Sequence, residues 1–258
     1  MPAAPKLTPT LAKEYSDFFN RCEIAANKMT EVEGVVQRIL QFQNRYARVA
    51  AQSTVPWYVI AVIHNMECGL SFAKHLHNGD SLERRTVNVP SGRPKTGKPP
   101  FTFEESAVDA LEYDGFTAWS DWSIGGICYK LEGYNGWGYR AHKINSPYLW
   151  SYSNLYRRGK YVEDNKWSDT AVSRQCGAAV ILRRMSERGA VDFTSPPSSK
   201  PIDATTLTEV PHTLFASGNR KRGGHRRSVV KRAIYAKEKT AAKTSSVRKI
   251  HPFPKGKV

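Results

Sequence analysis

The residue best placed for acid–base chemistry is Glu67, which stands near the end of an apolar segment. Pro56 suits the first turn of a helix and Gly69 suits its end, so the spacing predicts a helix of about three turns that finishes near Glu67. Glycosidases need a protonated carboxyl beside the bond that breaks. Partial desolvation by aliphatic neighbours would raise the pKa of this carboxyl and keep its proton near neutral pH; those neighbours are Ile60, Ile63 and Met66. Taken alone, a glutamate at a helix end is more often a solvated or capping residue.

A second carboxylate follows at Asp80, in the turn sequence His77-Asn78-Gly79-Asp80. In a glycosidase, a second carboxylate orients water or stabilises the positive sugar ring. An aspartate that follows Asn-Gly also bonds its own backbone in a turn. The sequence leaves both roles open for Asp80.

Metal chemistry is the less favoured interpretation of the histidines around Glu67. The His-Glu-x-x-His spacing of zinc proteases is absent, although a set could be imagined from His64, Glu67, His75 and His77. The cysteines are far apart and lack Cys-x-x-Cys spacing, so we expect reduced, buried thiols at Cys22, Cys68, Cys128 and Cys176. We therefore expect no metal and no cofactor.

Two segments resemble motifs of the goose-type lysozymes and soluble lytic transglycosylases. The segment from Pro56 to Phe72 is similar to their catalytic-helix motif, in which Ala and Ile precede the acid and a small residue and an aromatic one follow. The acid of that motif falls on Glu67. The segment from Tyr134 to Arg140 resembles the Tyr-Asn-Gly signature that closes the substrate groove opposite the acid. The resemblance implies that Glu67 protonates the leaving sugar.

Further short segments resemble a family of bacterial and phage lysozyme-like proteins, and the resemblance spans about residues 15 to 185. The segments are His75 to Asp80, Val89 to Pro94, Pro99 to Thr102, Tyr134 to Gly136 and Ser146 to Ser151. The chain departs from related patterns in two ways. Cys68 stands where serine is commoner, and the spacing from Glu67 to Asp80 and Thr86 differs from the shorter acid, Asp, Thr arrangement of T4-type phage lysozymes. The second departure puts the role of Asp80 in doubt.

The region from 134 to 150 is rich in aromatic side chains that could offer flat faces to sugar rings. Polar residues among them could bond N-acetyl or lactyl groups, although about half of the aromatics would serve the core instead. The predicted substrate-binding residues are Tyr134, Asn135, Trp137, Tyr139, Arg140 and Tyr148.

The elements that must position these residues are mainly helical. Apolar spacing predicts helices over 11–29, 30–49, 56–67, 102–111, 124–131 and 171–185. Thr30 with Glu33 and Thr102 with Glu105 have capping-box spacing. Turn residues followed by β-branched ones predict one small β-hairpin within 77–92. The expected fold class is mainly α, an α+β lysozyme-like helical domain with one hairpin.

Charge and composition divide the chain. The 258 residues carry a net charge of +16, and from Gly189 onward fifteen basic residues face four acidic ones, a net charge of +11. This part is poor in apolar residues, so we expect an N-terminal arm at 1–14, the lysozyme-like domain at 15–188 and a flexible, largely disordered basic tail at 189–258. The tail could bind an anionic membrane or lipopolysaccharide, or simply aid solubility.

The expected function is that of a muramidase, a peptidoglycan hydrolase that cleaves the β-1,4 bond between N-acetylmuramic acid and N-acetylglucosamine. Lytic transglycosylation at the same bond, wall binding without catalysis, and nucleic-acid binding are the alternatives. No recognised nucleic-acid module accompanies the tail. The start lacks a secretory signal pattern and no segment is apolar enough for a membrane span, so we expect a soluble monomer made in the cytoplasm that acts at the bacterial wall or periplasm, as a phage or prophage endolysin would.

Overall fold

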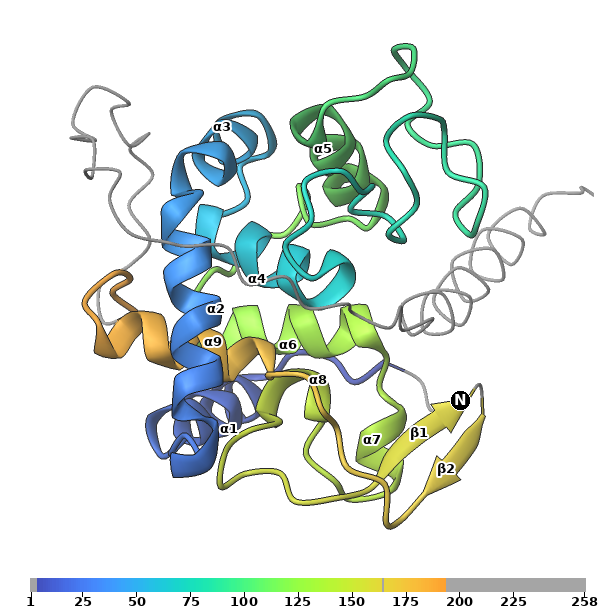
Figure 1. Cartoon of the computed structure of the whole chain (residues 1–258). Coiled ribbons are helices and arrows are strands. Elements are labelled where there is room, and N and C mark those ends of the chain that lie inside the picture. The colour runs from blue at the N-terminus through green and yellow to red at the C-terminus, as the bar shows by residue number, and fades with distance from the viewer. Residues whose placement is uncertain (1–3, 164, 194–258) are drawn as a thin grey trace, which may run out of the picture.

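The fold class predicted from the sequence is confirmed. The computed structural model describes residues 4–163 and 165–193; this part of the chain is mainly helical, with one small antiparallel hairpin (Figure 1). None of its helices combines the length and apolar character that crossing a membrane requires. In chain order the elements are α1 (Pro9–Asn20), the 3₁₀ turn η1 (Ala26–Lys28), α2 (Met29–Gln41), α3 (Gln43–Ser53), α4 (Trp57–Cys68), α5 (Phe103–Tyr113), α6 (Ile124–Asn135), α7 (Gly138–Ala141), α8 (Pro147–Trp150), β1 (Lys160–Glu163), β2 (Lys166–Ser168) and α9 (Ala178–Glu187).

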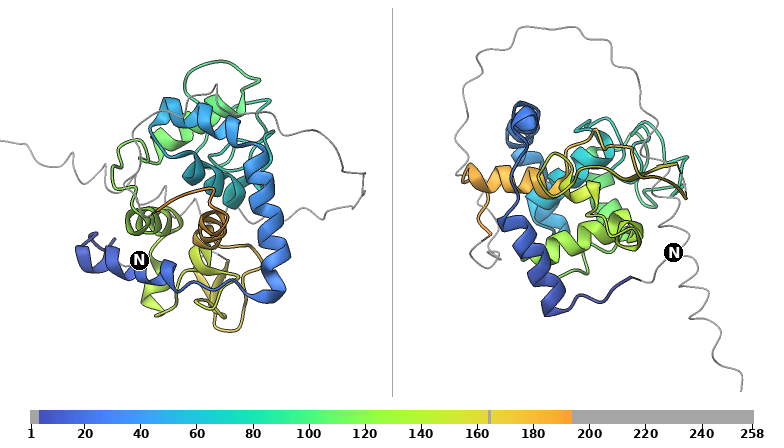
Figure 2. Two further views of the ribbon diagram at one scale, coloured as in Figure 1. Left: turned by 90° about the vertical axis from the view of Figure 1, so that its left-hand side faces the viewer. Right: turned by 90° about the horizontal axis from the view of Figure 1, so that it is seen from below.

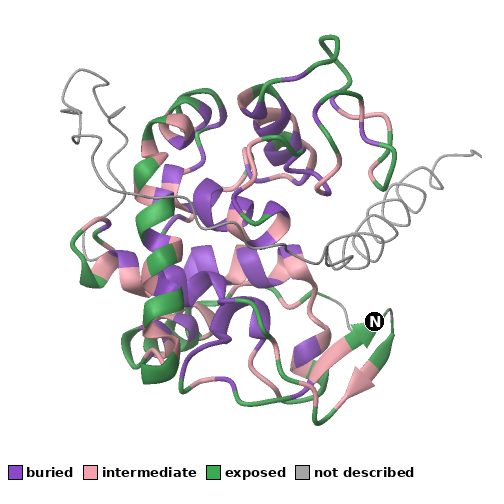
Figure 3. Cartoon of the chain, viewed as in Figure 1, coloured by how far each residue is buried: buried purple, intermediate pink, exposed green. Residues whose placement is uncertain are grey.

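The helix that carries Glu67 lies in the middle of the core (Figure 3). It is α4, which begins directly after Pro56 and ends at Gly69, as the sequence predicts. Gly69 has a φ of 58°, the left-handed conformation that glycine adopts at low cost. Nine of the twelve residues of α4 are buried, so the helix is apolar on nearly every side and is covered by α3 and α9. Each buried Val or Ile contributes about 2 kcal/mol to folding.

One long predicted helix is divided into two in the structure. The helix expected over 30–49 divides at Phe42 into α2 and α3, and the Thr30 capping box does not form because α2 already begins at Met29. Glu33 instead pairs with Arg184 and Arg188 at the end of α9. A tertiary ion pair has therefore replaced the local cap. By contrast, the Thr102–Glu105 capping box forms at the start of α5.

The first helix also ends early, at Asn20 rather than near Met29, because Ile24 forms a β-bridge with Ser153. α1 packs along α6 (Figure 2). α6 extends to Asn135, four residues beyond its predicted end. α9 begins at Ala178 rather than near Ala171, because the chain before it runs back along α8, where the Gly177 N–H donates to the Ser151 carbonyl oxygen at 3.0 Å.

The hairpin predicted within 77–92 is wrong in its position. The two strands lie instead at β1 and β2, where Lys160 faces Ser168 and Tyr161 faces Trp167. In the 77–92 segment the polar side chains bond backbone groups of the same loop, which removes the donors and acceptors that a strand ladder would need. The described segment contains only an isolated bridge from Lys74 to Ser81 at its edge.

The described residues include both predicted domain limits but only the start of the predicted tail. α1 starts at Pro9, and the Pro5 carbonyl oxygen accepts from the Tyr129 hydroxyl at 2.7 Å, so part of the predicted arm contacts the helical domain. At the other limit, Phe193 packs edge-on against Phe19 and Tyr58. Most of the predicted basic tail, from 194 onward, lies outside the described residues. The four cysteines are buried, unbridged thiols.

Candidate active site around Glu67

The structure brings Glu67 together with Tyr148, which is 81 positions further along the chain. Glu67 lies in the last turn of α4 and is half-buried. The Tyr148 hydroxyl, from the one-turn helix α8, donates to Glu67 Oε1 at 3.3 Å. This contact joins two residues that the sequence analysis had assigned separately, one to catalysis and the other to substrate binding.

Tyr148 is a neutral hydrogen-bond donor at this site. Its side chain is buried, with a relative exposure of 3%. Burial, together with the negative charges of Glu67 and Asp114, raises the pKa of Tyr148 well above its usual value. The hydroxyl therefore keeps its proton at neutral and acidic pH.

Tyr134 is the third predicted residue in this neighbourhood. It lies in the last turn of α6, and its ring centroid is 6.4 Å from that of Tyr148 and 5.3 Å from that of Phe116. Only 7% of Tyr134 is exposed, so it supports the site from within more than it offers a face to a sugar. Its neighbour Asn135 has a buried amide oxygen, Oδ1, without a hydrogen-bond partner among the described residues.

Sequence reasoning missed Gln175 and Asp114. Gln175 is exposed, and its Nε2 donates to the Met66 carbonyl oxygen at 2.8 Å, directly before Glu67 in the chain. Gln175 falls in the stretch expected to be helix 171–185, so the pattern gave no reason to separate it from the core. Asp114 follows α5 and is 93% buried near Tyr148. Asp114 directly follows an amphipathic helix, a position at which a polar residue is usually exposed, so the sequence pattern gave no sign that it is buried.

Asp80 organises the loop that follows α4. Its carboxylate accepts the backbone N–H groups of Val87 and Asn88 at 2.8 and 2.9 Å, and the side-chain amides of Asn88 and Asn78 at 2.6 and 3.1 Å. Burial alone would raise the pKa of Asp80, but these hydrogen bonds lower it overall. Asp80 is thus an ionised loop residue, and its part in catalysis stays a prediction.

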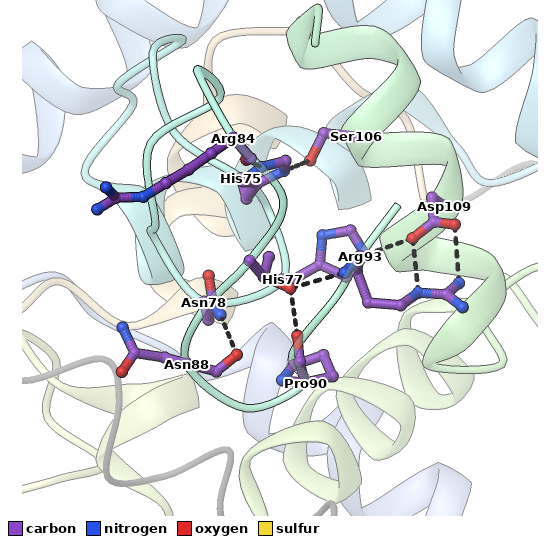
Figure 4. Close-up of polar contacts among 10 residues, drawn as sticks. His75, His77, Asn78, Arg84, Asn88, Pro90, Arg93, Ser106 and Asp109 are labelled. Atoms are coloured by element: carbon purple, nitrogen blue, oxygen red, sulfur yellow. Dashed lines mark hydrogen bonds and ion pairs between the residues drawn. The ribbon is translucent and has the colours of Figure 1, made fainter. Parts of the chain in front are cut away.

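The loop from His75 to Phe101 is held against α5 by a buried polar network (Figure 4). Asp109 on α5 accepts from Arg93 at 2.8 Å through both carboxylate oxygens and contacts His77 Nε2 at 2.7 Å. His75 contacts the Ser106 hydroxyl and the Arg84 carbonyl oxygen. These partners tie the loop to the same core as α4, and the Cys68 thiol donates to the His75 carbonyl oxygen at 3.3 Å.

The histidines considered as metal ligands have protein partners instead. His64 is fully buried on α4, where its Nδ1 lies 3.0 Å from the Tyr46 hydroxyl and its ring packs against Phe72 and Phe103. Burial lowers the pKa of His64 to about 4. Within 4–163 and 165–193, no cluster of three or more His, Cys, Asp or Glu side chains could hold a metal ion.

Three predicted substrate-binding residues lie in a different neighbourhood, next to α1 and the hairpin. Trp137 packs against Tyr129, and Tyr139 packs against Tyr161 and Trp167. Arg140 contacts the carboxylates of Glu14 and Glu132 and the Tyr15 hydroxyl. A cleft of about 200 Å³ opens beside Arg140, and Glu67 is not among its lining residues. The Nη groups of Arg140 donate to protein groups, whereas its buried Nε has no hydrogen-bond partner among the described residues. Substrate binding by these three residues stays a prediction.

No family model, curated protein or solved structure matches the chain.

Proposed function

We propose that the protein is a peptidoglycan hydrolase of the muramidase type, with Glu67 as the general acid. The observation that carries this proposal is the setting of Glu67: a half-buried carboxyl at the end of a buried helix, bonded by the Tyr148 hydroxyl. Partial desolvation helps a carboxyl to hold its proton, and a fixed neutral donor stabilises the carboxylate that remains after the proton is delivered. The motif resemblance around Glu67 and Tyr134 supplies the substrate class.

In the proposed reaction, Glu67 gives its proton to the glycosidic oxygen as the bond to the muramic acid carbon breaks. The leaving oxygen keeps the bonding electron pair, and the positive charge develops on the sugar ring. Water then adds to the anomeric carbon and releases a proton, and the Glu67 carboxylate takes up one proton, which completes hydrolysis and restores the acid. Attack by the muramyl 6-hydroxyl in place of water would make the protein a lytic transglycosylase, the alternative outcome at the same bond.

Peptidoglycan strands are accordingly the proposed partner, and the bacterial wall or periplasm is the proposed place of action. The protein is proposed to work as a monomer without a cofactor. An anionic membrane or lipopolysaccharide stays a proposed partner of the basic tail. Wall binding without cleavage is the other candidate, and the cleft beside Arg140 is the feature that favours it.

Product analysis tests the proposal. Purified sacculi are digested with the full chain, and the products are identified by mass spectrometry. Reducing muropeptides are expected; 1,6-anhydro products would establish transglycosylation instead. Absence of any glycan cleavage by the folded full chain, with retained binding to sacculi, would replace the enzyme by a wall-binding protein.

A further inference from the structure

A small set of contacts between α4, α8 and the segment before α9 fixes the position of Glu67 relative to Tyr148. Gln175 Nε2 bonds the Met66 carbonyl oxygen at 2.8 Å, and the Gly177 N–H bonds the Ser151 carbonyl oxygen at 3.0 Å. A Cβ added to Gly177 would lie only 2.2 Å from the Leu149 carbonyl oxygen, so the segment lies directly on α8. The segment 175–177 therefore ties the last turn of α4 to the helix that carries Tyr148.

The Tyr148 hydroxyl acts on Glu67 as a donor in this structure. Burial and nearby negative charge raise the pKa of Tyr148 well above its usual value, so the hydroxyl does not lose its own proton to Glu67. Its proton points to Oε1, at 3.3 Å. A protonated Oε1 would place two hydrogens between the same two oxygens, so the acid proton belongs on Oε2.

We propose that Tyr148 is a positioning residue for the proposed reaction: its hydroxyl holds Oε1 of Glu67 and so directs the proton on Oε2 toward the leaving sugar oxygen. The proposal rests on the proposed function and assigns Tyr148 a different role from sugar binding. When Glu67 gives up its proton, the bond from Tyr148 strengthens because its acceptor becomes charged. Tyr148 thereby stabilises the carboxylate that proton transfer leaves behind.

The titratable groups that act on the Tyr148 hydroxyl come from two elements besides α8. Glu67 and Cys68 belong to α4, and Asp114 follows α5. Tyr134 adds a ring contact from α6. A pH-dependent signal at Tyr148 must therefore be separated between the two carboxyls, Glu67 and Asp114.

The test in the wild-type full chain is a pH titration by NMR, with ¹³C in the Glu carboxyl and the Tyr Cζ carbons. Glu67→Gln and Asp114→Asn serve to assign the signals. We expect the Tyr148 Cζ signal to shift with the same midpoint as the Glu67 carboxyl, and to lose that shift in Glu67→Gln. A Tyr148 signal that does not follow Glu67, or that follows Asp114 alone, would overturn the proposal without requiring any variant of Tyr148.

Tyr148→Phe provides the kinetic arm. Loss of the hydroxyl removes a bond that favours the ionised carboxylate, so the Glu67 midpoint and the alkaline limb of the kcat profile should both rise by about one pH unit. On the plateau below that limb, where Glu67 is protonated in both proteins, we expect kcat to fall roughly tenfold because the proton is less well directed. KM for glycan fragments should change little, because the substrate is not the partner that is lost. A raised KM with both midpoints unchanged would return Tyr148 to substrate binding and overturn the proposal.

Tyr15→Phe is the matched control, because the Tyr15 hydroxyl is also buried and donates to a glutamate, Glu132, at 2.6 Å. It should lower stability without moving the Glu67 midpoint. The two proposals fail in different ways. If the wild-type chain cuts no glycan, the proposed function fails, whereas the NMR titration still reports whether Tyr148 and Glu67 are coupled.

Discussion

Two buried tyrosine–glutamate pairs in this molecule have different surroundings. Glu132 is 3% exposed and is bonded by Tyr15 and the Arg140 guanidinium. Burial raises the pKa of Glu132 despite these partners. Glu67 is half-buried and receives the Tyr148 hydroxyl in the last turn of a helix.

The difference separates a carboxyl that holds the fold together from one that can meet a substrate. Glu132 joins α6 to α1 and α7, and its charge is shielded by a cation and enclosed by protein. Proton transfer requires the acid to reach the reacting oxygen, and Glu67 is more exposed than Glu132, which is 3% exposed although it lines the cleft beside Arg140. A perturbed pKa alone selects Glu132, and not the glutamate that is proposed as the acid.

The largest expected effect is on activity at Glu67. Glu67→Gln keeps nearly the same shape but cannot supply a proton, so kcat on purified glycan should fall roughly 10²- to 10⁴-fold. Glu31→Gln is the matched control, because Glu31 also accepts a tyrosine hydroxyl, that of Tyr152 at 2.7 Å. The rate of muropeptide release is measured for both variants and for wild type, and folding is checked by circular dichroism. Full lysis by folded Glu67→Gln would remove Glu67 from the mechanism.

The second effect is on stability at the other pair. Arg140→Met keeps the aliphatic stem but leaves the buried Glu132 without its cation, so the free energy of unfolding should fall by about 3 kcal/mol, at the low end for a buried pair because Arg140 is partly exposed. Arg183→Met, which loses a surface pair with Glu187, should cost no more than about 0.5 kcal/mol. Urea unfolding compares them. A large fall in the kcat of the folded Arg140 variant would bring this cleft into the reaction.

The third effect is the pH dependence of stability through His64, which lies on the same helix as Glu67. Burial lowers the pKa of His64 from 6.5 to about 4, so the folded state binds fewer protons than the unfolded state between these values. Its contribution to stability is complete above pH 6.5 and is lost as the pH falls toward 4, a total of about 3 kcal/mol. Urea unfolding across this range should show a steeper loss for wild type than for His64→Gln. Parallel curves would mean that His64 titrates normally.

The smallest effect concerns Asp80. Asp80→Asn removes the negative charge of a carboxylate that accepts hydrogen bonds from two backbone N–H groups in the loop. We expect the free energy of unfolding to fall by about 1 kcal/mol. Stability and kcat are measured on the same preparation. A kcat that falls further than the folded fraction would make Asp80 a second carboxylate of the reaction, and an unchanged kcat would leave it as a loop residue.

The residues at and near the helix ends account for the bounds of α4 and α5. Pro56 and Gly69 bound a helix whose apolar residues leave it no position other than the core, and Thr102 with Glu105 caps the next helix in the manner predicted. These elements follow from the backbone chemistry of a few neighbouring residues. The position of Glu67 at a helix end could therefore be read directly from the sequence.

Competing long-range contacts explain where prediction failed. The Thr30 capping box does not form, and Glu33 pairs with Arg184 of α9 instead. The predicted hairpin near Asp80 does not form, and hydrogen bonds within the loop take its place. The strands formed instead at 160–168, where Tyr161 and Trp167 pack with Tyr139 from α7. Strand position depends on such partners, which lie far away in the sequence.

The sequence by itself determined the helical class, the helix that carries Glu67 in its last turn and the residue types available for the site. Only the tertiary structure decided that Tyr148, and not Arg140, contacts that acid, and that Gln175 anchors the helix end. The reason is physical: helix ends and caps depend on residues within one or two turns, whereas the partner of a carboxyl depends on which distant elements pack against it.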